Sequence, residues 1–164
     1  NSLADVLKCD KTLTFGNGDP NSTSGFAIPG YYVWALNNKT PEECFSRVVS
    51  SNHEGNAMAV ANKKVDVATN NTESIYARLA QSNPEAAANI KEIWRSPVIP
   101  EGPVVLSKKL PDDIKAKMTE LMANLVKEDK ECGYGVMAGE ARGFEPITHA
   151  AYESIVAARK AKSE

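Results

Sequence analysis

The first half of the chain repeats one local pattern: a short apolar run, then a cluster of small polar residues, then a segment of helix-forming composition. The apolar runs are Thr12–Phe15, Phe45–Ser51 and Val65–Thr69. Polar residues that cap helices or form turns follow each run at once. Successive strand–turn–helix units of this kind predict an α/β fold, with a parallel sheet covered by helices on both faces.

The polar clusters that follow the runs are Asn21–Ser24, Asn52–Glu54 and Asn70–Glu73. In a parallel sheet, the loops at the carboxyl ends of the strands gather at one edge, and ligands bind there. We therefore expect these clusters to lie together and to form the ligand site.

The first cluster belongs to the stretch FGNGDPNSTSGF, in which Gly16 and Gly18 permit a tight loop. Ser22, Thr23 and Ser24 then open the next helical segment. The unpaired N–H groups and the positive dipole end of a helix N-terminus favour an anion. The loop contains no Lys, Arg or Cys, which separates it from a P-loop or a thiolate phosphatase loop. It predicts an oxyanion site of hydroxyls and amides; the alternative is an ordinary capped helix.

Segments beyond the predicted sheet give further expectations. Pro29 lies inside the first helical segment and should kink it or delay its regular part. Ile93–Val105 carries several prolines, which suits an extended crossover between lobes and not a central strand. A boundary near Ile99 gives predicted units of residues 1–98 and 99–164.

The segment after the crossover is predicted to be mainly helical. A helix opened by Pro111 carries an apolar stripe that we assign to packing, formed by Ile114, Met118, Leu121, Met122 and Leu125. The Gly-rich stretch Cys132–Gly143 is predicted to be a loop, and Thr148 is predicted to cap a last helix that runs towards Lys160.

Composition limits the possible functions. With 42% hydrophobic and 24% charged residues and a net charge of -2, the chain reads as globular, without a bias towards nucleic acid or anionic membranes. No apolar run approaches the ~20 residues of a membrane span, so any export signal is expected outside this chain. The 3 cysteines lack metal-ligand spacing, and at least one must be unpaired within the chain. No metal or cofactor is predicted.

Together these motifs resemble the substrate-binding proteins of phosphonate ABC transporters, a branch of the type II periplasmic binding proteins. The matching stretches are LTFGNGDPNSTSGF, PGYYV, NHEGNAMAVANKKVDVATNNTE and IWRSPVIP, within roughly residues 3–110. The resemblance implies a periplasmic bacterial protein that is not an enzyme and delivers a small phosphorus oxyanion to a membrane permease. It also implies that this chain is the second lobe, and that its C-terminal helices belong to a first lobe missing from the chain.

The resemblance assigns the ligand contacts. In the family, the STSG motif holds the phosphonate oxygens, which corresponds here to Ser22–Ser24. The family's phosphonate-contacting histidine matches His53, and its pocket glutamate matches Glu73. The predicted binding set also includes Asn21, which we expect, like Asp19, to brace the loop by local side-chain to backbone bonds. No catalytic residue is predicted.

One departure from the family pattern concerns the ligand. Members carry an aspartate that meets an ammonium group of the ligand, whereas this chain has Gly102 at that position, next to Glu101. The choice between an alkylphosphonate, 2-aminoethylphosphonate and phosphite therefore stays open.

Two other functions are weighed against binding. A phosphoryl-transfer or phosphonate-hydrolysing enzyme would use Ser22 or Thr23 as nucleophile and His53 as base. It would need metal ligands or a basic clamp, and the loop cluster contains neither in sequence. A regulatory domain joined to a DNA-binding region would need a basic patch or a helix-turn-helix, which this sequence lacks.

Overall fold

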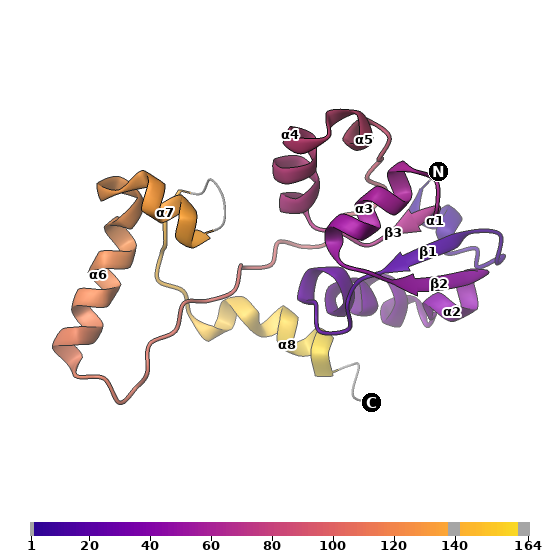
Figure 1. Cartoon of the computed structure of the whole chain (residues 1–164). Coiled ribbons are helices and arrows are strands. Elements are labelled where there is room, and N and C mark those ends of the chain that lie inside the picture. Colours follow the sequence, from indigo (N-terminus) through magenta and orange to yellow (C-terminus); the bar gives the residue numbers. More distant parts are fainter. Residues whose placement is uncertain (1, 138–141, 161–164) are drawn as a thin grey trace. The chain divides into compact units, whose positions relative to one another are not determined.

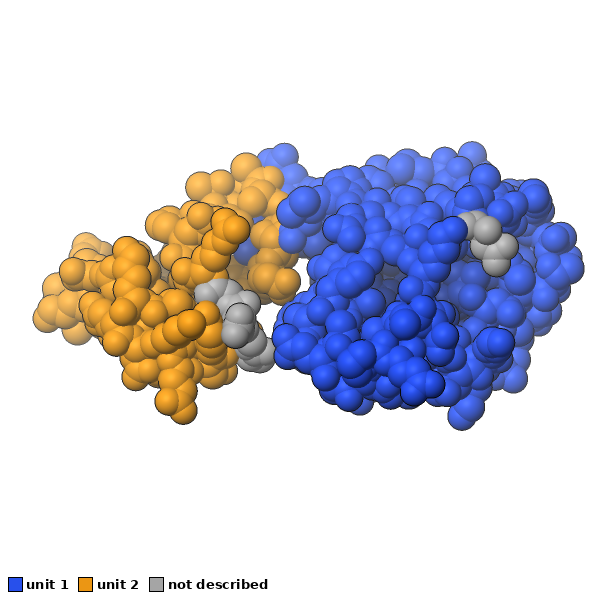
Figure 2. Space-filling view, turned by 90° about the horizontal axis from the view of Figure 1, so that it is seen from above, with its two compact units in different colours: residues 1–99, 152–164 blue, residues 100–151 orange. Residues whose placement is uncertain are grey.

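The computed structural model describes residues 2–137 and 142–160. The chain forms two compact units (Figure 2). The first unit comprises Asn1–Ile99 together with Tyr152–Glu164, and the second comprises Pro100–Ala151. The first unit contains the sheet and all of the predicted ligand-binding residues.

The sheet of the first unit is parallel, as the repeated pattern predicts. Its strands are β1 (Thr14–Asn17), β2 (Arg47–Ser50) and β3 (Val67–Ala68), in the order β2-β1-β3. Phe15 of β1 pairs with Val48 on one side and with Val67 on the other. The central strand therefore leads into the Gly-rich loop, and its neighbours lead into the other two polar clusters.

Helices cover both faces of this sheet (Figure 1). Successive side chains of a strand point to opposite faces. On one face, Phe15 stacks on Phe45 at 4.7 Å between ring centroids and meets Trp34 edge-on at 5.6 Å. On the other face, Ala57 of α3 belongs to a second buried cluster. The first face is covered by α1 (Leu3–Val6), η2 (Gly30–Trp34) and α2 (Pro41–Cys44), the second by α3 (His53–Ala61), η4 (Glu73–Leu79) and α5 (Pro84–Ala88). The short α4 (Ala80–Ser82) continues η4.

The prediction that Gly16 belongs to the loop is wrong. Gly16 lies within β1, where a Cβ atom would stand 2.8 Å from Oδ1 of Asn56 and 3.1 Å from Cβ of Ala68. The glycine is required because α3 approaches the sheet closely here. The strand ends at Asn17, two residues beyond the predicted end at Phe15.

The helical segment after the loop contains Pro29 without a break. η1 (Thr23–Ala27), η2 (Gly30–Trp34) and the short η3 (Ala35–Asn37) follow one another, and Pro29 keeps helical angles of φ -60° and ψ -37°. The segments on either side of the proline are wound as π-helix. The wider winding takes the place of the kink or delayed start that the sequence predicts.

A disulfide joins Cys9, just after α1, to Cys44 at the end of α2. The two cysteines are 35 residues apart, and the closed loop includes β1 and the whole Gly-rich stretch. Cys132 is the exposed free thiol that the odd cysteine count requires.

The second unit is built on α6 (Asp112–Glu128) and α7 (Lys130–Met137). The loop predicted from Cys132 is wrong over the residues up to Met137, and residues 138–141 of that prediction lie outside the described residues. Oδ1 of Asp129 accepts a hydrogen bond from the N–H of Cys132 at 2.9 Å, which caps the first turn of α7. A Cβ atom at Gly133 would lie 2.7 Å from Val126, so this glycine allows α6 and α7 to pack closely.

The remaining predicted elements are present. Residues 91–106 form no helix or strand, in agreement with an extended crossover. Thr148 directly precedes η5 (His149–Tyr152), and α8 (Glu153–Lys160) completes the described chain. In the part of the chain that the structure describes, no helix combines the length and apolar character needed to cross a membrane.

Candidate functional site

The loops after β1, β2 and β3 meet at the carboxyl edge of the sheet (Figure 1). Hydrogen bonds connect all of them. Oγ1 of Thr69, after β3, donates to the carbonyl oxygen of Gly25 at 2.6 Å. Nδ2 of Asn70 donates to the carbonyl oxygen of His53 at 2.7 Å. The structure thus brings the three predicted polar clusters into one site.

Ser22 is the N-cap of η1. Its Oγ accepts a hydrogen bond from the N–H of Gly25 at 3.0 Å, while the residue itself keeps an extended backbone. Thr23 and Ser24 stand in the first turn, where backbone N–H groups have no intrahelical partner. The helix start therefore presents backbone donors and hydroxyls together, although the Ser22 oxygen is already occupied by the cap.

Ser24 and His53 form a direct contact between two of the clusters. Oγ of Ser24 lies 3.3 Å from Nε2 of His53, which stands at the first position of α3. Nδ1 of His53 is buried and has no hydrogen-bond partner among the described residues. Burial lowers the pKa of His53 below its ordinary value, and the carboxylate of Glu73 opposes that change. In the structure His53 is therefore mainly neutral at neutral pH.

Glu73 opens η4 beside this pair, as predicted. Its Oε1 lies 2.6 Å from a terminal nitrogen of Arg78, in an ion pair whose side chains are 40% and 59% exposed. Its carboxylate also acts on the imidazole of His53, whose pKa it raises against the effect of burial. The ion pair with Arg78 orients this carboxylate.

Asn21 is exposed and is held through its backbone. Its N–H donates to Oδ1 of Asp19 at 2.8 Å. Its carbonyl oxygen accepts from Arg159 at 3.1 Å. These two hydrogen bonds involve the main chain of Asn21, and a role for its side chain stays a prediction.

A cation that the sequence analysis does not include lies beside the predicted hydroxyls and amides. A terminal nitrogen of Arg159, on α8, lies 3.1 Å from Oγ1 of Thr23 as well as from the Asn21 carbonyl oxygen. Arg159 follows Thr23 by 136 residues, and nothing in the local loop sequence indicates the contact. A cation therefore stands at the hydroxyl cluster.

Asn56 is a structural member of the site that sequence reasoning missed. It is 1% exposed, and its Nδ2 lies 2.9 Å from the Asn17 carbonyl oxygen and 3.3 Å from those of Gly16 and Thr69. The signal that could have revealed it is a polar residue on the face of α3 that otherwise carries alanines.

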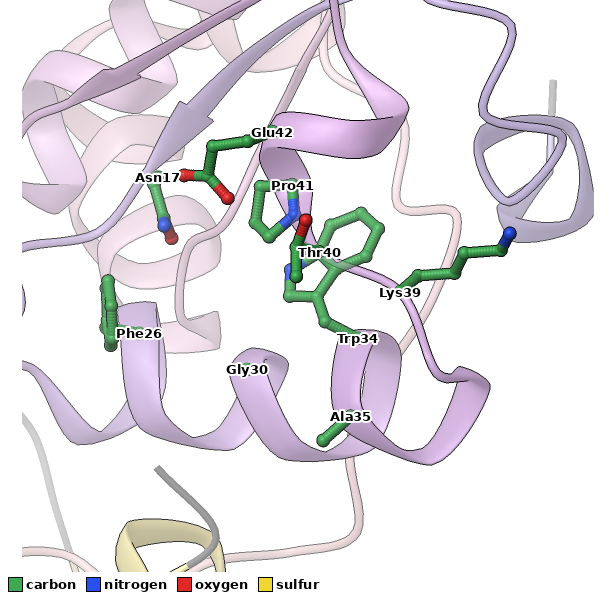
Figure 3. A pocket seen from close by; sticks show the side chains of 9 residues that line it. All are labelled: Asn17, Phe26, Gly30, Trp34, Ala35, Lys39, Thr40, Pro41 and Glu42. Carbon is green, nitrogen blue, oxygen red and sulfur yellow. The ribbon is translucent and has the colours of Figure 1, made fainter. Parts of the chain in front are cut away.

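A separate cavity of about 340 Å³ lies between η2 and the start of α2 (Figure 3). Asn17, Phe26 and Trp34 contribute to its walls. None of the predicted ligand-binding residues lines it. Within residues 2–137 and 142–160, no group of three or more His, Cys, Asp or Glu side chains is placed to hold a metal ion.

A parallel sheet whose carboxyl edge carries a hydroxyl-capped helix start is an arrangement in which α/β proteins bind anions. The family described as "ABC transporter, phosphonate, periplasmic substrate-binding protein" matches residues 1–152, and the chain belongs to that family. This confirms the resemblance identified from the sequence motifs.

Two similar proteins support the assignment. The phosphonates-binding periplasmic protein of Escherichia coli (strain K12) is 52% identical over 131 residues, which are 80% of this chain and 38% of that protein. A crystal structure of a binding protein component of an ABC phosphonate transporter from Pseudomonas aeruginosa matches with a TM-score of 0.73 and 42% identity. That match covers 98% of this chain and 52% of the other. The chain thus spans about half or less of the length of these relatives.

Proposed function

We propose that this chain supplies one lobe of a periplasmic solute-binding protein that delivers a small phosphorus oxyanion to the permease of an ABC importer. The observation that carries the proposal is the contact of Ser24 with His53 at the start of η1. It combines hydroxyls, free backbone donors and an imidazole at one point. Family membership and the names of both relatives support the same function.

The chemistry of the site fits a tetrahedral oxyanion. Ser22–Ser24 provide hydroxyl and amide donors, which form short charge-assisted hydrogen bonds to phosphonate oxygens. Nε2 of His53 lies within reach of the same position. Glu73 repels an anion unless a P–OH proton or a cationic group of the ligand meets its carboxylate, and the ion pair with Arg78 offsets part of this repulsion. The proposed ligands are an alkylphosphonate, 2-aminoethylphosphonate or phosphite.

The proposed complete protein has a first lobe that closes over the anion. Ile114, Met118 and Leu121 form one stripe of α6 and are 37%, 39% and 56% exposed. We propose that the segment from residue 99 onward packs on that first lobe through this stripe. Its last helix, α8, instead contacts η1 and η2 in the first unit.

The test is calorimetric titration of the full-length protein with methylphosphonate, 2-aminoethylphosphonate and phosphite, with sulfate as the control anion. Tight binding of at least one phosphorus ligand, weakened by Thr23→Ala, supports the function. Sulfate binding that equals that of every phosphorus ligand would contradict it.

The enzyme alternative requires its own measurement. Arg159 supplies a basic group at Thr23, so the lack of cations in the loop sequence no longer argues against catalysis. The relatives are nevertheless binding components by name. A turnover assay on the same ligands, with and without divalent metal ions, should show no consumption, and release of inorganic phosphate would support the enzyme.

A further inference from the structure

We propose that Arg159 of α8 is a specificity-determining residue of the anion site, which strengthens Thr23 as a donor and favours doubly charged ligands. The inference rests on the proposed function and deepens it. It concerns a residue beyond the segment that the family description matches, residues 1–152.

The geometry connects Arg159 to the ligand-binding loop at two points. One terminal nitrogen lies 3.1 Å from the carbonyl oxygen of Asn21 and 3.1 Å from Oγ1 of Thr23. A guanidinium nitrogen of this kind carries two hydrogens, so it can donate to both oxygens at once. The planar group is thus held against the loop by a backbone oxygen as well as by a side chain.

The contact fixes the role of the Thr23 hydroxyl. A hydroxyl has one hydrogen to donate and can accept two hydrogen bonds. Because Oγ1 of Thr23 accepts from Arg159, its own hydrogen remains available for an anion. Hydrogen bonds in a chain polarise one another, so a hydroxyl that accepts from a cation becomes a stronger donor.

The other hydroxyls of the cluster lack this support. Oγ of Ser22 accepts from the N–H of Gly25 and serves the helix cap. Oγ of Ser24 pairs with His53, whose pKa is lowered by burial. Arg159 therefore brings a positive charge to a site whose histidine is mainly neutral.

The charge affects ligand choice as well as affinity. The attraction of a fixed cation grows with the charge of the ligand and is weakened by salt when the cation is exposed. Arg159 is exposed. A dianionic methylphosphonate should therefore benefit more than the singly charged dimethylphosphinate, which has the same phosphorus centre and one ionisable oxygen fewer.

The test compares Arg159→Gln with Lys160→Gln in the full-length protein. Both variants remove one positive charge from adjacent exposed positions of α8, but it is Arg159 that donates to Asn21 and Thr23 of the loop. Affinity for methylphosphonate and dimethylphosphinate is measured by calorimetry at about 0.02 M and about 0.5 M salt. Thermal unfolding of each variant checks that the fold is intact.

We expect Arg159→Gln to weaken methylphosphonate binding about 5- to 20-fold at low salt, with a smaller loss at high salt and for dimethylphosphinate. Lys160→Gln should change the affinity less than about twofold. Arg159→Lys should recover part of the loss, because it keeps the charge without the planar fork. Thr23→Ala should cost less in the Arg159→Gln background than in the wild type, because the two groups act together.

Three results would contradict the role of Arg159. Equal affinities for Arg159→Gln and Lys160→Gln would overturn the role of Arg159 while leaving the proposed function intact. Tighter binding by Arg159→Gln would mean that the side chain blocks the site. A wild-type protein that binds no phosphorus ligand would overturn the proposed function and this inference with it.

Discussion

Gly18 and Gly25 meet backbone to backbone across the Gly-rich loop. The N–H of Gly18 donates to the carbonyl oxygen of Gly25 at 3.1 Å, and a Cβ atom on Gly18 would collide with the carbonyl group of Gly25. Oγ1 of Thr69 donates to the same carbonyl oxygen. The start of η1 is thereby fixed against the ends of β1 and β3, which holds the hydroxyl cluster in place without help from a ligand.

Gly18→Ala should therefore destabilise the protein by about 2 to 3 kcal/mol, because the loop and η1 must separate to admit the methyl group. Gly30→Ala is the matched control. A Cβ atom at Gly30 meets nothing within 4 Å, and its helical position should gain up to about 1 kcal/mol. Urea unfolding of both variants measures the difference. Equal stabilities would mean that the close approach does not constrain the fold.

Ser22 and Thr23 should separate stability from binding. Ser22→Ala removes the N-cap of η1 and should lower the free energy of unfolding by about 1 kcal/mol, besides weakening the ligand. Thr23→Ala leaves the cap intact and should cost about 1.5 to 3 kcal/mol of phosphonate binding, with little change in stability. Calorimetry and thermal unfolding provide the two readouts. Full affinity in both variants would exclude this helix start as the anion site.

His53 should contribute a pH-dependent part of ligand binding. Burial lowers its pKa in the free site, and a bound dianion should raise it, so binding takes up a proton between these two pKa values. Affinity then rises as the pH falls through the bound-state pKa and levels off below the free-state pKa. The second ionisation of the ligand acts in the opposite direction if only the dianion binds.

Calorimetry in buffers of different ionisation enthalpy measures this proton uptake. His53→Ala should remove it, and His149→Ala, at the other histidine of the chain, should not. The lowered pKa also affects folding: its contribution to stability is complete above the ordinary pKa of 6.5 and is lost as the pH falls through the folded-state value. Parallel pH profiles of His53→Ala and the wild type would make His53 a purely structural residue.

Removal of the Cys9–Cys44 disulfide should lower the free energy of unfolding by about 4 kcal/mol, the chain-entropy value for a closed loop of this length. The double variant Cys9→Ser/Cys44→Ala tests this by denaturant unfolding. Cys132→Ser should leave the stability within about 0.5 kcal/mol, because that thiol is exposed and free. A double variant as stable as the wild type would show that the other contacts of α1 and α2 suffice.

Gly102→Asp should shift ligand preference towards the amine. If the natural ligand lacks an ammonium group, the new carboxylate should favour 2-aminoethylphosphonate over methylphosphonate by about 1.5 to 3 kcal/mol, less the cost of its desolvation. The site of substitution has room, since a Cβ atom there meets nothing within 4 Å. Titration of wild type and variant with both ligands measures the change. A wild type that already prefers the aminated ligand would refute the interpretation of Gly102.

The parts of the fold that were predicted correctly have local causes. A capping residue or a proline acts within one turn of the chain. The start of α3 after the cluster Asn52–Glu54 and the extended course of residues 91–106 therefore follow from the sequence. Gly133 shows where prediction from local sequence fails. A glycine-rich stretch predicts a loop, but the same glycine also permits the close packing of α6 and α7.

The missed features of the site depend on distant contacts. The disulfide joins Cys9 to Cys44, and a hydrogen bond joins Arg159 to Thr23. Both contacts connect residues far apart in the chain, and a single sequence does not reveal such pairs. The meeting of the loops that carry Ser24 and His53 was predicted, because parallel strands bring successive loops to the same edge. The meeting of the polar loops could thus be predicted from the topology of the sheet. The position of Arg159 depends on tertiary packing and could not be predicted.

The single amide of Asn56 has a consequence for how such a protein changes its ligand. It binds carbonyl groups at the end of β1 and after β3 to one helix, so the positions of the two loops are fixed by a residue outside the predicted ligand-contacting set. Side chains at the rim are then free to vary without moving the backbone that carries them. Diversification of ligand preference in this lobe should therefore proceed by single exchanges at the rim, while Asn56 is retained in every descendant that keeps the same loop spacing.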